Sequence, residues 1–292
     1  MKSFTTKTRK GAIPQALGFL LLRLCMVTVV LILSYILFDI ISKGYSSISF
    51  EFLSEMPREG MTQGGIFPAI LGTFYLAVLT TLFSVPLGVF SAIYLNEYSR
   101  PGVFTRIVRM AIRNLSGVPS IVFGLFGMAF FIQYMGLRPS LLASSLTLAL
   151  LTLPVTITSS EEALKTVPDS YREGSLALGA TKSRMIGTIV LPQALPGMLT
   201  GAILGLSRAA GETAPILFTG AAFFLPFLPD SVMSQFMALP YHLYIMATQH
   251  HSISTVRPIA YGTAFVLVVM IVILNMMANV LRIYFRKKVK RH

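Results

Sequence analysis

The chain has 292 residues, of which 54% are hydrophobic and only 12% are charged, with a mean hydropathy of +0.73. So few charged residues cannot cover the surface of a soluble domain of this size, which excludes a water-soluble enzyme or binding module. The formal net charge is +13. The basic residues bracket apolar runs instead of alternating with aromatic residues, so they indicate membrane topology and contact with anionic lipid, not nucleic acid.

Six apolar runs are long enough to cross the hydrocarbon core of a bilayer, which takes about 20 helical residues. The predicted fold is therefore an all-α membrane protein, a six-span helical bundle. Pro or Gly lies inside several runs, so we expect kinks or tilts there. The predicted spans are 16–42, 67–96, 114–136, 140–160, 194–225 and 258–282.

The segments between the spans differ in charge, and this difference predicts the orientation. Lys and Arg gather in the amino-terminal tail 1–15, between the second and third spans, in the segment 161–192 and in the basic tail 283–292. Basic residues close to span ends are retained in the cytoplasm. Both termini are therefore expected to be cytoplasmic, and the segments 43–66 and 226–257 are expected to be external.

The segment 161–192 is polar, lies between two apolar runs, and is predicted to dock onto a partner. Ser170 and Glu173 have the spacing of a capping box, which favours the start of a short helix. Gly179 can adopt the positive φ at which such a helix ends, and Thr181 is an acceptable N-cap for a second short helix. The pair of helices would present an apolar surface too small for a core of its own, made of Tyr171, Leu176, Ala177 and Leu178.

The fifth predicted span carries three glycines and two charges on one stripe of a continuous helix, at about 100° per residue. Repeated Gly-x-x-x-Gly lets another helix approach closely in a membrane. The glycines are therefore predicted to serve helix packing. The stripe consists of Gly197, Gly201, Gly205, Arg208 and Glu212.

Arg208 and Glu212 stand four residues apart and can neutralise each other, which matters because a lone charge in the bilayer costs roughly 3 kcal/mol or more. Two interpretations stay open. The pair lines a substrate pathway, with Ser207 and Thr213 as nearby donors and with backbone groups freed by Pro215, or it only holds helices together. An Arg guanidinium matches a tetrahedral oxyanion through forked hydrogen bonds, which favours an anion as substrate.

Residue types that carry catalysis are scarce. The sequence has no Gly-x-x-x-x-Gly-Lys-Ser/Thr loop, so any ATP is expected to bind to another chain. His250 and His251 are adjacent in an external segment without nearby carboxylates, which argues against a metal site. The single cysteine, Cys25, is expected to serve packing. We therefore predict a protein that is not an enzyme, with no catalytic residue, no metal and no bound cofactor.

The spacing within 161–192 resembles the EAA loop of ABC importer permeases. In that loop Glu-Ala-Ala is followed at fixed distances by Gly and by Ile-x-Leu-Pro, and here two small residues replace the alanines. The resemblance implies that the segment lies in the cytoplasm and fits a cleft in an ATP-hydrolysing subunit. The residues implied in this coupling are Glu173, Gly174, Ser175, Ala177, Leu178, Gly179, Ile189, Leu191 and Pro192.

Three motifs together are similar to the permease subunits of phosphate-specific ABC importers, and most to their A-type subunit: LSRAAGETAPILFTG, NLSGVPSIVFGLFG and the segment 161–181. The likeness covers about residues 65–282. It implies a type I ABC importer permease that forms half of a translocation path for inorganic phosphate, with Arg208 and Glu212 as the charged pair of this branch. For NLSGVPSIVFGLFG, tight packing of a broken helix start is favoured over substrate contact.

The same resemblance implies the partners and the mechanism. A second similar permease subunit, two copies of an ATPase subunit and an external phosphate-binding protein would assemble with the chain in the inner (plasma) membrane. The Gly-rich face of the fifth span is expected to meet the second permease, and the segments 43–66 and 226–257 are expected to receive the binding protein. ATP-driven closure of the ATPases would push 161–192 and alternate the access of the path.

Two alternatives remain at this point. The chain could be the permease of another oxyanion ABC importer. Less favoured is an ion-coupled secondary transporter, which would need an internal repeat of spans that the sequence does not reveal.

Overall fold

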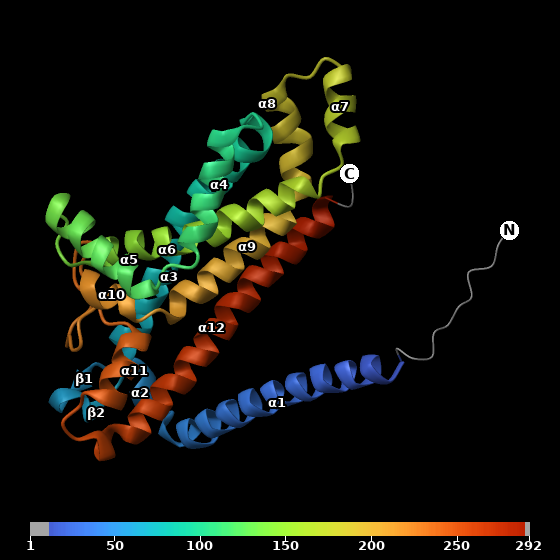
Figure 1. Cartoon of the computed structure of the whole chain (residues 1–292). Helices are drawn as coiled ribbons and strands as arrows, with labels where there is room; N and C mark the ends of the chain where they lie inside the picture. Colours follow the sequence, from blue (N-terminus) through green and yellow to red (C-terminus); the bar gives the residue numbers. More distant parts are fainter. Residues whose placement is uncertain (1–11, 290–292) are drawn as a thin grey trace.

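The computed structural model describes residues 12–289. Four long helices form the centre of the bundle: α3 (Phe67–Ile93), α6 (Leu141–Lys165), α9 (Leu191–Gly211) and α12 (Ile253–Val289). α6 packs against both α3 and α9, and α12 packs against α9 (Figure 1). Within the described residues, five helices are long and apolar enough to cross a membrane, or six if one bent pair counts as a span. The all-α membrane class is confirmed.

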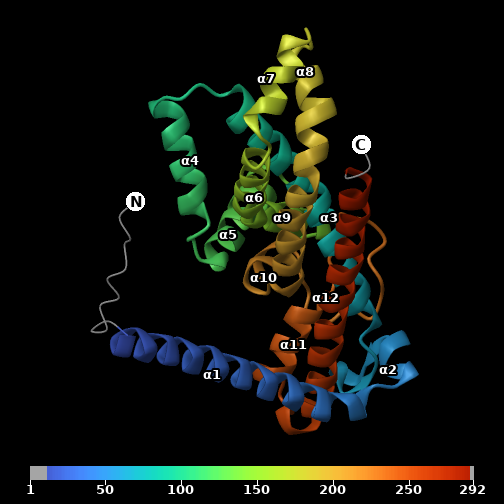
Figure 2. The ribbon, with the colours of Figure 1, turned by 90° about the vertical axis from the view of Figure 1, so that its right-hand side faces the viewer.

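The helix α1 (Ala12–Gly44) diverges from the bundle in both views (Figures 1 and 2). The carboxyl end of α1 contacts the first half of α12. Gly44 permits that contact, because a Cβ there would lie 2.6 Å from the carbonyl oxygen of Tyr261. Close by, Lys43 Nζ lies 3.4 Å from the Tyr261 hydroxyl. The apolar sequence thus forms a helix that the rest of this chain leaves exposed.

The predicted first span 16–42 lies within α1, and its Cys25 is exposed instead of packed against the rest of the chain. Two predictions fall partly outside the described part of the chain. These are residues 1–11 of the amino-terminal tail and residues 290–292 of the basic tail. The rest of the basic tail, residues 283–289, continues α12.

Short elements close one end of the bundle, within the predicted external segments. Ser49 caps α2 by accepting a hydrogen bond from the Phe52 amide at 3.0 Å. β1 and β2 form an antiparallel hairpin in which Pro57 pairs with Gly64. Phe52, Met61 and buried side chains of α11 share one apolar cluster. The elements are η2 (Tyr45–Ser47), α2 (Phe50–Ser54), β1 (Pro57–Arg58), η3 (Glu59–Met61), β2 (Gln63–Gly64) and α11 (Leu239–Thr248).

The predicted third span 114–136 differs from the structure, which bends the chain by 103° between two helical segments. The first segment is α4 (Val103–Leu115), and the second is α5 (Ser120–Gly127) continued by the π-helical η5 (Met128–Tyr134). Pro119 causes the break, because a proline disfavours helical conformation in the residue before it. NLSGVPSIVFGLFG is therefore a broken helix start, as the Gly and Pro content predicted.

The polar segment between the fourth and fifth spans is shorter than the predicted 161–192. α6 continues to Lys165, and a helix resumes at Lys182 through α8 (Lys182–Met185) and the π-helical η6 (Ile186–Val190) into α9. The only free helix of this segment is α7 (Asp169–Ala177). Instead of two short helices, one short helix sits between two long ones.

The predicted fifth span 194–225 is also interrupted. α9 ends at Gly211, and α10 (Ala214–Thr219) begins after a two-residue break. Pro215 explains the interruption, since it has no amide proton and its ring would clash with the carbonyl four residues earlier, that of Gly211. Residues 220–238 then run without a helix to α11.

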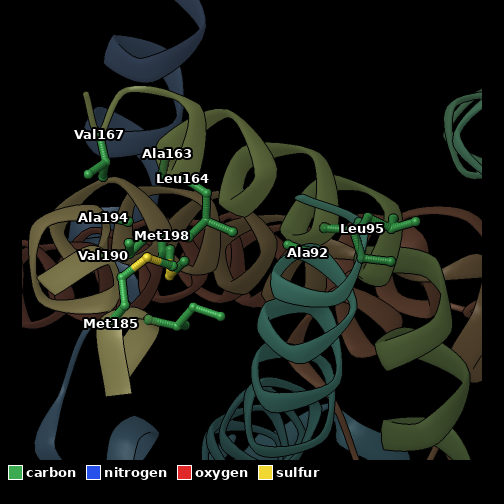
Figure 3. Close-up of a cluster of buried hydrophobic side chains, with 11 residues drawn as sticks. Ala92, Leu95, Ala163, Leu164, Val167, Met185, Val190, Ala194 and Met198 are labelled. Atoms are coloured by element: carbon green, nitrogen blue, oxygen red, sulfur yellow. The ribbon is translucent and has the colours of Figure 1, made fainter. Parts of the chain in front are cut away.

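A buried apolar cluster joins the ends of three helices beside α7 (Figure 3). It contains Ala92 and Leu95 from the end of α3, Ala163 and Leu164 from the end of α6, and Met185 from α8. Val190, Ala194 and Met198 add the start of the fifth span. This cluster therefore packs α6, which precedes α7, and α8, which follows it, together with the end of α3.

Candidate functional site

The start of α7 differs from the predicted capping box of Ser170 and Glu173. The helix begins at Asp169 after Pro168, whose φ of −60° and ψ of 141° place it at the N-cap without a side-chain cap bond. Ser170 therefore lies inside the first turn, where it cannot cap. A proline fixes φ near the value that this helix entry needs, and the Asp169 carboxylate complements the positive end of the helix dipole.

The end of α7 is as predicted, with Gly179 at φ +80°. Its amide donates to the Leu176 carbonyl at 2.9 Å and the Ala180 amide donates to the Ser175 carbonyl at 3.2 Å. These two bonds form a Schellman motif, which requires a left-handed residue where Gly179 stands. The predicted cap at Thr181 is also confirmed, because its hydroxyl accepts from the Arg184 amide at 3.4 Å.

The exposed face of α7 carries apolar side chains. Leu178 is 90% exposed, and Tyr171 and Leu176 are about half exposed. Glu173, Gly174 and Ala177 are exposed with them, while Ser175 is buried. Ile189, Leu191 and Pro192, the other members of the predicted coupling set, lie half-buried in the long helix that leads into α9. The structure therefore divides the predicted coupling residues between the exposed surface around α7 and the start of the helix that forms the fifth span.

Arg172, which was not among the predicted site residues, fastens α7 to the bundle. Its guanidinium lies 2.9 Å and 3.4 Å from the two carboxylate oxygens of Glu97, 75 residues away in the sequence. It also donates to the carbonyls of Val167 at 2.6 Å and Leu164 at 2.9 Å, and to Asp169 at 3.0 Å. No local sequence signal reveals such a pair, because both partners look like ordinary charges at span ends.

A second ion group lies near the first. Arg109 of α4 contacts Glu161 of α6 at 2.9 Å, and Lys165 contacts the same carboxylate oxygen at 3.0 Å. The Glu161 side chain is only 9% exposed. Arg109 also donates to the Leu95 carbonyl at 2.9 Å. The end of α3 is thus bonded to α4 as well as to α7.

Arg208 and Glu212 meet, but in a different setting from the predicted continuous helix. Their side chains approach to 3.3 Å and are 38% and 18% exposed. Glu212 has an extended backbone, with ψ 133°, and so lies in the break after α9. Thr213 is the other residue of that break, whereas the Ser207 hydroxyl points to Asn275 of α12 at 2.6 Å. Arg208, Glu212 and Thr213 therefore lie at or next to the break after α9. Ser207, the fourth predicted pathway residue, instead bonds α12.

The Gly-rich stripe packs against α6 of the same chain, which corrects the expectation that it meets a second permease. A Cβ at Gly197 would lie 2.6 Å from the Ala163 Cβ, and one at Gly201 would overlap Ser159. Gly205 faces Thr152 and Thr156 at ordinary contact distance. Small residues on both helices allow this close approach, which is the usual basis of helix packing in membranes.

The sequence matches the family of binding-protein-dependent transport system inner membrane components over residues 84–291. The chain belongs to this family. The permease is 32% identical over 276 residues to the probable ABC transporter permease protein YqgI of Bacillus subtilis, covering 91% of this chain and 94% of that protein. It is 34% identical to the phosphate transport system permease protein PstA of Mycobacterium leprae, covering 86% and 82%.

Solved structures agree with the fold of the permease. The bacterial ABC transporter involved in the import of the acidic polysaccharide alginate superposes with a TM-score of 0.63, covering 90% of this chain and 95% of that chain at 14% identity. The permease is thus a membrane-spanning subunit of the ABC importer kind. Its family implies an ATPase and a substrate-binding protein as partners.

The closed end of the permease contains two buried histidines, His242 and His250, within the predicted external segment 226–257. His242 of α11 is 2% exposed, and neither of its ring nitrogens has a hydrogen-bond partner among the described residues. Burial, with a smaller effect from His250, lowers the pKa of His242 to about 4. His250 Nε2 lies 2.9 Å from the Gly60 carbonyl and thereby ties α11 to the hairpin. These histidines serve the packing of this end.

Proposed function

We propose that this permease is the subunit of an ATP-driven importer of inorganic phosphate that forms half of its translocation path. The observation that carries the substrate is sequence similarity: relatives named phosphate transport system permease protein PstA are 33–41% identical over 64–88% of the chain. Similarity of this extent covers the fifth span and its charged break as well as α7. The A-type subunit is therefore the assignment that fits best.

The break after α9 supplies suitable chemistry for an oxyanion. Arg208 offers several donors in a planar fork, which suits two oxygens of a tetrahedral anion. Glu212 neutralises Arg208 at 3.3 Å when no anion is present. A carboxylate accepts hydrogen bonds, so it suits an oxyanion that still carries a proton. Thr213 and the unwound backbone add polar groups at the same level.

α7 is proposed as the contact with the ATPase. Its exposed Leu178 and Tyr171 offer an apolar surface to a cleft in a partner. We further propose a second similar permease, two ATPase copies and an external phosphate-binding protein as the assembly, with no cofactor bound by this chain. In Figure 1, α7, α8 and the carboxyl end of α12 share one end of the molecule, which supports a cytoplasmic position for all three.

The test is uptake of labelled phosphate by vesicles that contain the permease with all proposed partners, with and without ATP. We expect uptake only with ATP and the binding protein present. Transport of sulfate or another oxyanion in place of phosphate would change the substrate and keep the ABC assignment. Uptake that follows an ion gradient without ATP would support the secondary-transporter alternative instead.

A further inference from the structure

The end of α3 is a π-helical turn, η4 (Tyr94–Tyr98), on which three other elements converge. Arg172 of α7 bonds Glu97, and Arg109 of α4 bonds the Leu95 carbonyl. Lys182, the first residue of α8, places its ammonium 5.1 Å from the centre of the Tyr98 ring. The 166–181 segment and the helix that follows it thus both contact η4, although neither is adjacent to it in sequence. Such π-helical turns occur frequently at functional sites.

The pair of Arg172 and Glu97 has the features of a rigid link. The two side chains are 15% and 5% exposed, so solvent screens their attraction little. A buried ion pair is tolerated only when further hydrogen bonds satisfy its polar atoms. Here the guanidinium also bonds the Leu164 carbonyl at the end of α6 and the Val167 carbonyl in the α6–α7 connection, and Asn96 donates to Glu97 at 2.8 Å. Forked bonds of this kind fix the orientation of both groups.

The surrounding packing joins η4 to the two elements that flank α7 in the chain. Leu95 belongs to the same buried cluster as Leu164 at the end of α6 and Met185 of α8 (Figure 3). Dense packing of this kind transmits displacement instead of absorbing it. The chain itself connects α7 only to α6 and α8. Without the ion pair, α7 could pivot about Thr166–Pro168 and Ala180–Thr181 while α3 stayed in place.

We infer that Arg172 and Glu97 are positioning residues that make the end of α3 follow α7, so that force applied to α7 reaches a third span as well as the two joined to it by the chain. This inference rests on the proposed contact of α7 with the ATPase. It assigns to η4 the role of a junction: α3 and, through Arg109, α4 respond together with α6 and α9. Substrate binding is not expected to involve either residue.

The experiment compares substrate uptake with ATP hydrolysis in the reconstituted complex of Glu97→Gln. We expect ATP hydrolysis to continue while uptake per ATP falls by roughly tenfold, within the range usual for coupling between sites. Asp169→Asn is the matched control, because Asp169 bonds the same arginine from a position that is 87% exposed. It should leave the ratio of uptake to hydrolysis unchanged. A wild-type ratio in Glu97→Gln would overturn the inference.

Two further arms keep the test decisive. The double change Glu97→Gln with Arg172→Gln should lower the ratio no further than the more severe of the two single changes, whereas losses that multiply would contradict a link. If Glu97→Gln fails to assemble, Arg172→Lys takes its place. It keeps the charge but loses the forked hydrogen bonds, so the ratio of uptake to hydrolysis should still fall below that of the wild type, by less than tenfold. The ratio is measured with whichever anion the wild-type complex transports, so a wrong substrate assignment does not affect the result.

Discussion

Arg208 and Glu212 meet although the helix that would hold them on one face ends between them. In a continuous helix their pairing would follow from spacing alone. Here Glu212 leaves the helix and still turns its carboxylate back to 3.3 Å from Arg208. A carboxylate on an extended segment can move further than one on a helix. The break therefore suits a pair that must open for a substrate better than one that only packs helices.

The first prediction at this scale concerns Arg208→Gln. Removing the guanidinium should lower phosphate uptake by more than about tenfold in a correctly assembled complex, since hydrogen bonds to a charged group contribute about 1.5–3 kcal/mol each. Uptake and assembly are both measured. Arg282→Gln is the control, because Arg282 donates a hydrogen bond to the Thr200 hydroxyl at 3.2 Å, in the first half of α9 and not at the break that follows that helix. Uptake equal to wild type in Arg208→Gln would reduce the pair to a packing role.

The second concerns His242 and pH. Its pKa in the folded protein is about 4, below the ordinary histidine value of 6.5, because burial disfavours the charged ring. Between these values the unfolded chain takes up a proton that the folded chain does not. Stability should therefore fall as pH drops from 6.5 towards 4, by at most about 1.4 kcal/mol per pH unit.

His242→Leu removes this dependence and two unpartnered nitrogens. Its thermal unfolding temperature in detergent should exceed that of the wild type more at pH 5 than at pH 8. His251→Leu, at an exposed neighbouring position, should shift neither value. An equal shift for His242→Leu at both pH values would show that folding does not lower the pKa of His242.

At the scale of the elements, hydropathy located the spans wherever a helix is continuous, although α6 continues to Lys165 beyond the predicted 160 and α12 runs from Ile253 to Val289 where 258–282 was predicted. The second span, predicted at 67–96, is α3 with its π-helical end. The runs 114–136 and 194–225 were each predicted as one span, the first with a broken helix start and the second with a kink, because apolar composition does not change where a helix is interrupted. Pro119 and Pro215 mark these breaks, yet a proline inside a span is also compatible with a mere kink, as Pro86 and Pro154 show.

The candidate site was predictable only where its geometry is local. Gly179 and Thr181 act within four residues of their partners, so the sequence was sufficient. Glu97 and Arg172 are 75 residues apart, and their pairing depends on how α3 and α6 pack. The partner of the glycine stripe was mistaken for a similar reason. Small residues indicate close approach but not which helix approaches.

The prediction at this scale is that Gly201→Ala weakens the contact of α9 with α6. A Cβ there would overlap Ser159, so one helix must shift, at a cost of about 1–3 kcal/mol. Gly187→Ala is the control, since a Cβ at that helical position has open space around it. The control should be neutral or slightly stabilising. The measurement is the thermal unfolding temperature of the purified chain, which Gly201→Ala should lower. If the glycine face met only a second permease, Gly201→Ala would leave this temperature unchanged.

At the scale of the whole molecule, the two ends differ in build. One end carries the hairpin β1–β2, α2 and α11 around a buried apolar cluster. The other end carries α7 and α8, which project together beyond α3, α6 and α12 (Figure 1). Leu178, between α7 and α8 in the chain, is exposed. An end closed by its own core suits contact with the binding protein, whereas a projecting helix suits contact with the ATPase and the transmission of its movement. The distribution of basic residues predicts that α7 lies on the cytoplasmic side.

The last prediction tests this orientation with single cysteines in a Cys25→Ala background. Leu178→Cys and His251→Cys are both at exposed positions, one at each end of the molecule. A thiol reagent that cannot cross the membrane should label His251→Cys in intact cells. It should label Leu178→Cys only after the membrane is opened, because the basic residues flanking α7 are retained on the inner side. Labelling of Leu178→Cys in intact cells would place α7 outside, where no ATPase could reach it, and would remove the basis of the coupling mechanism.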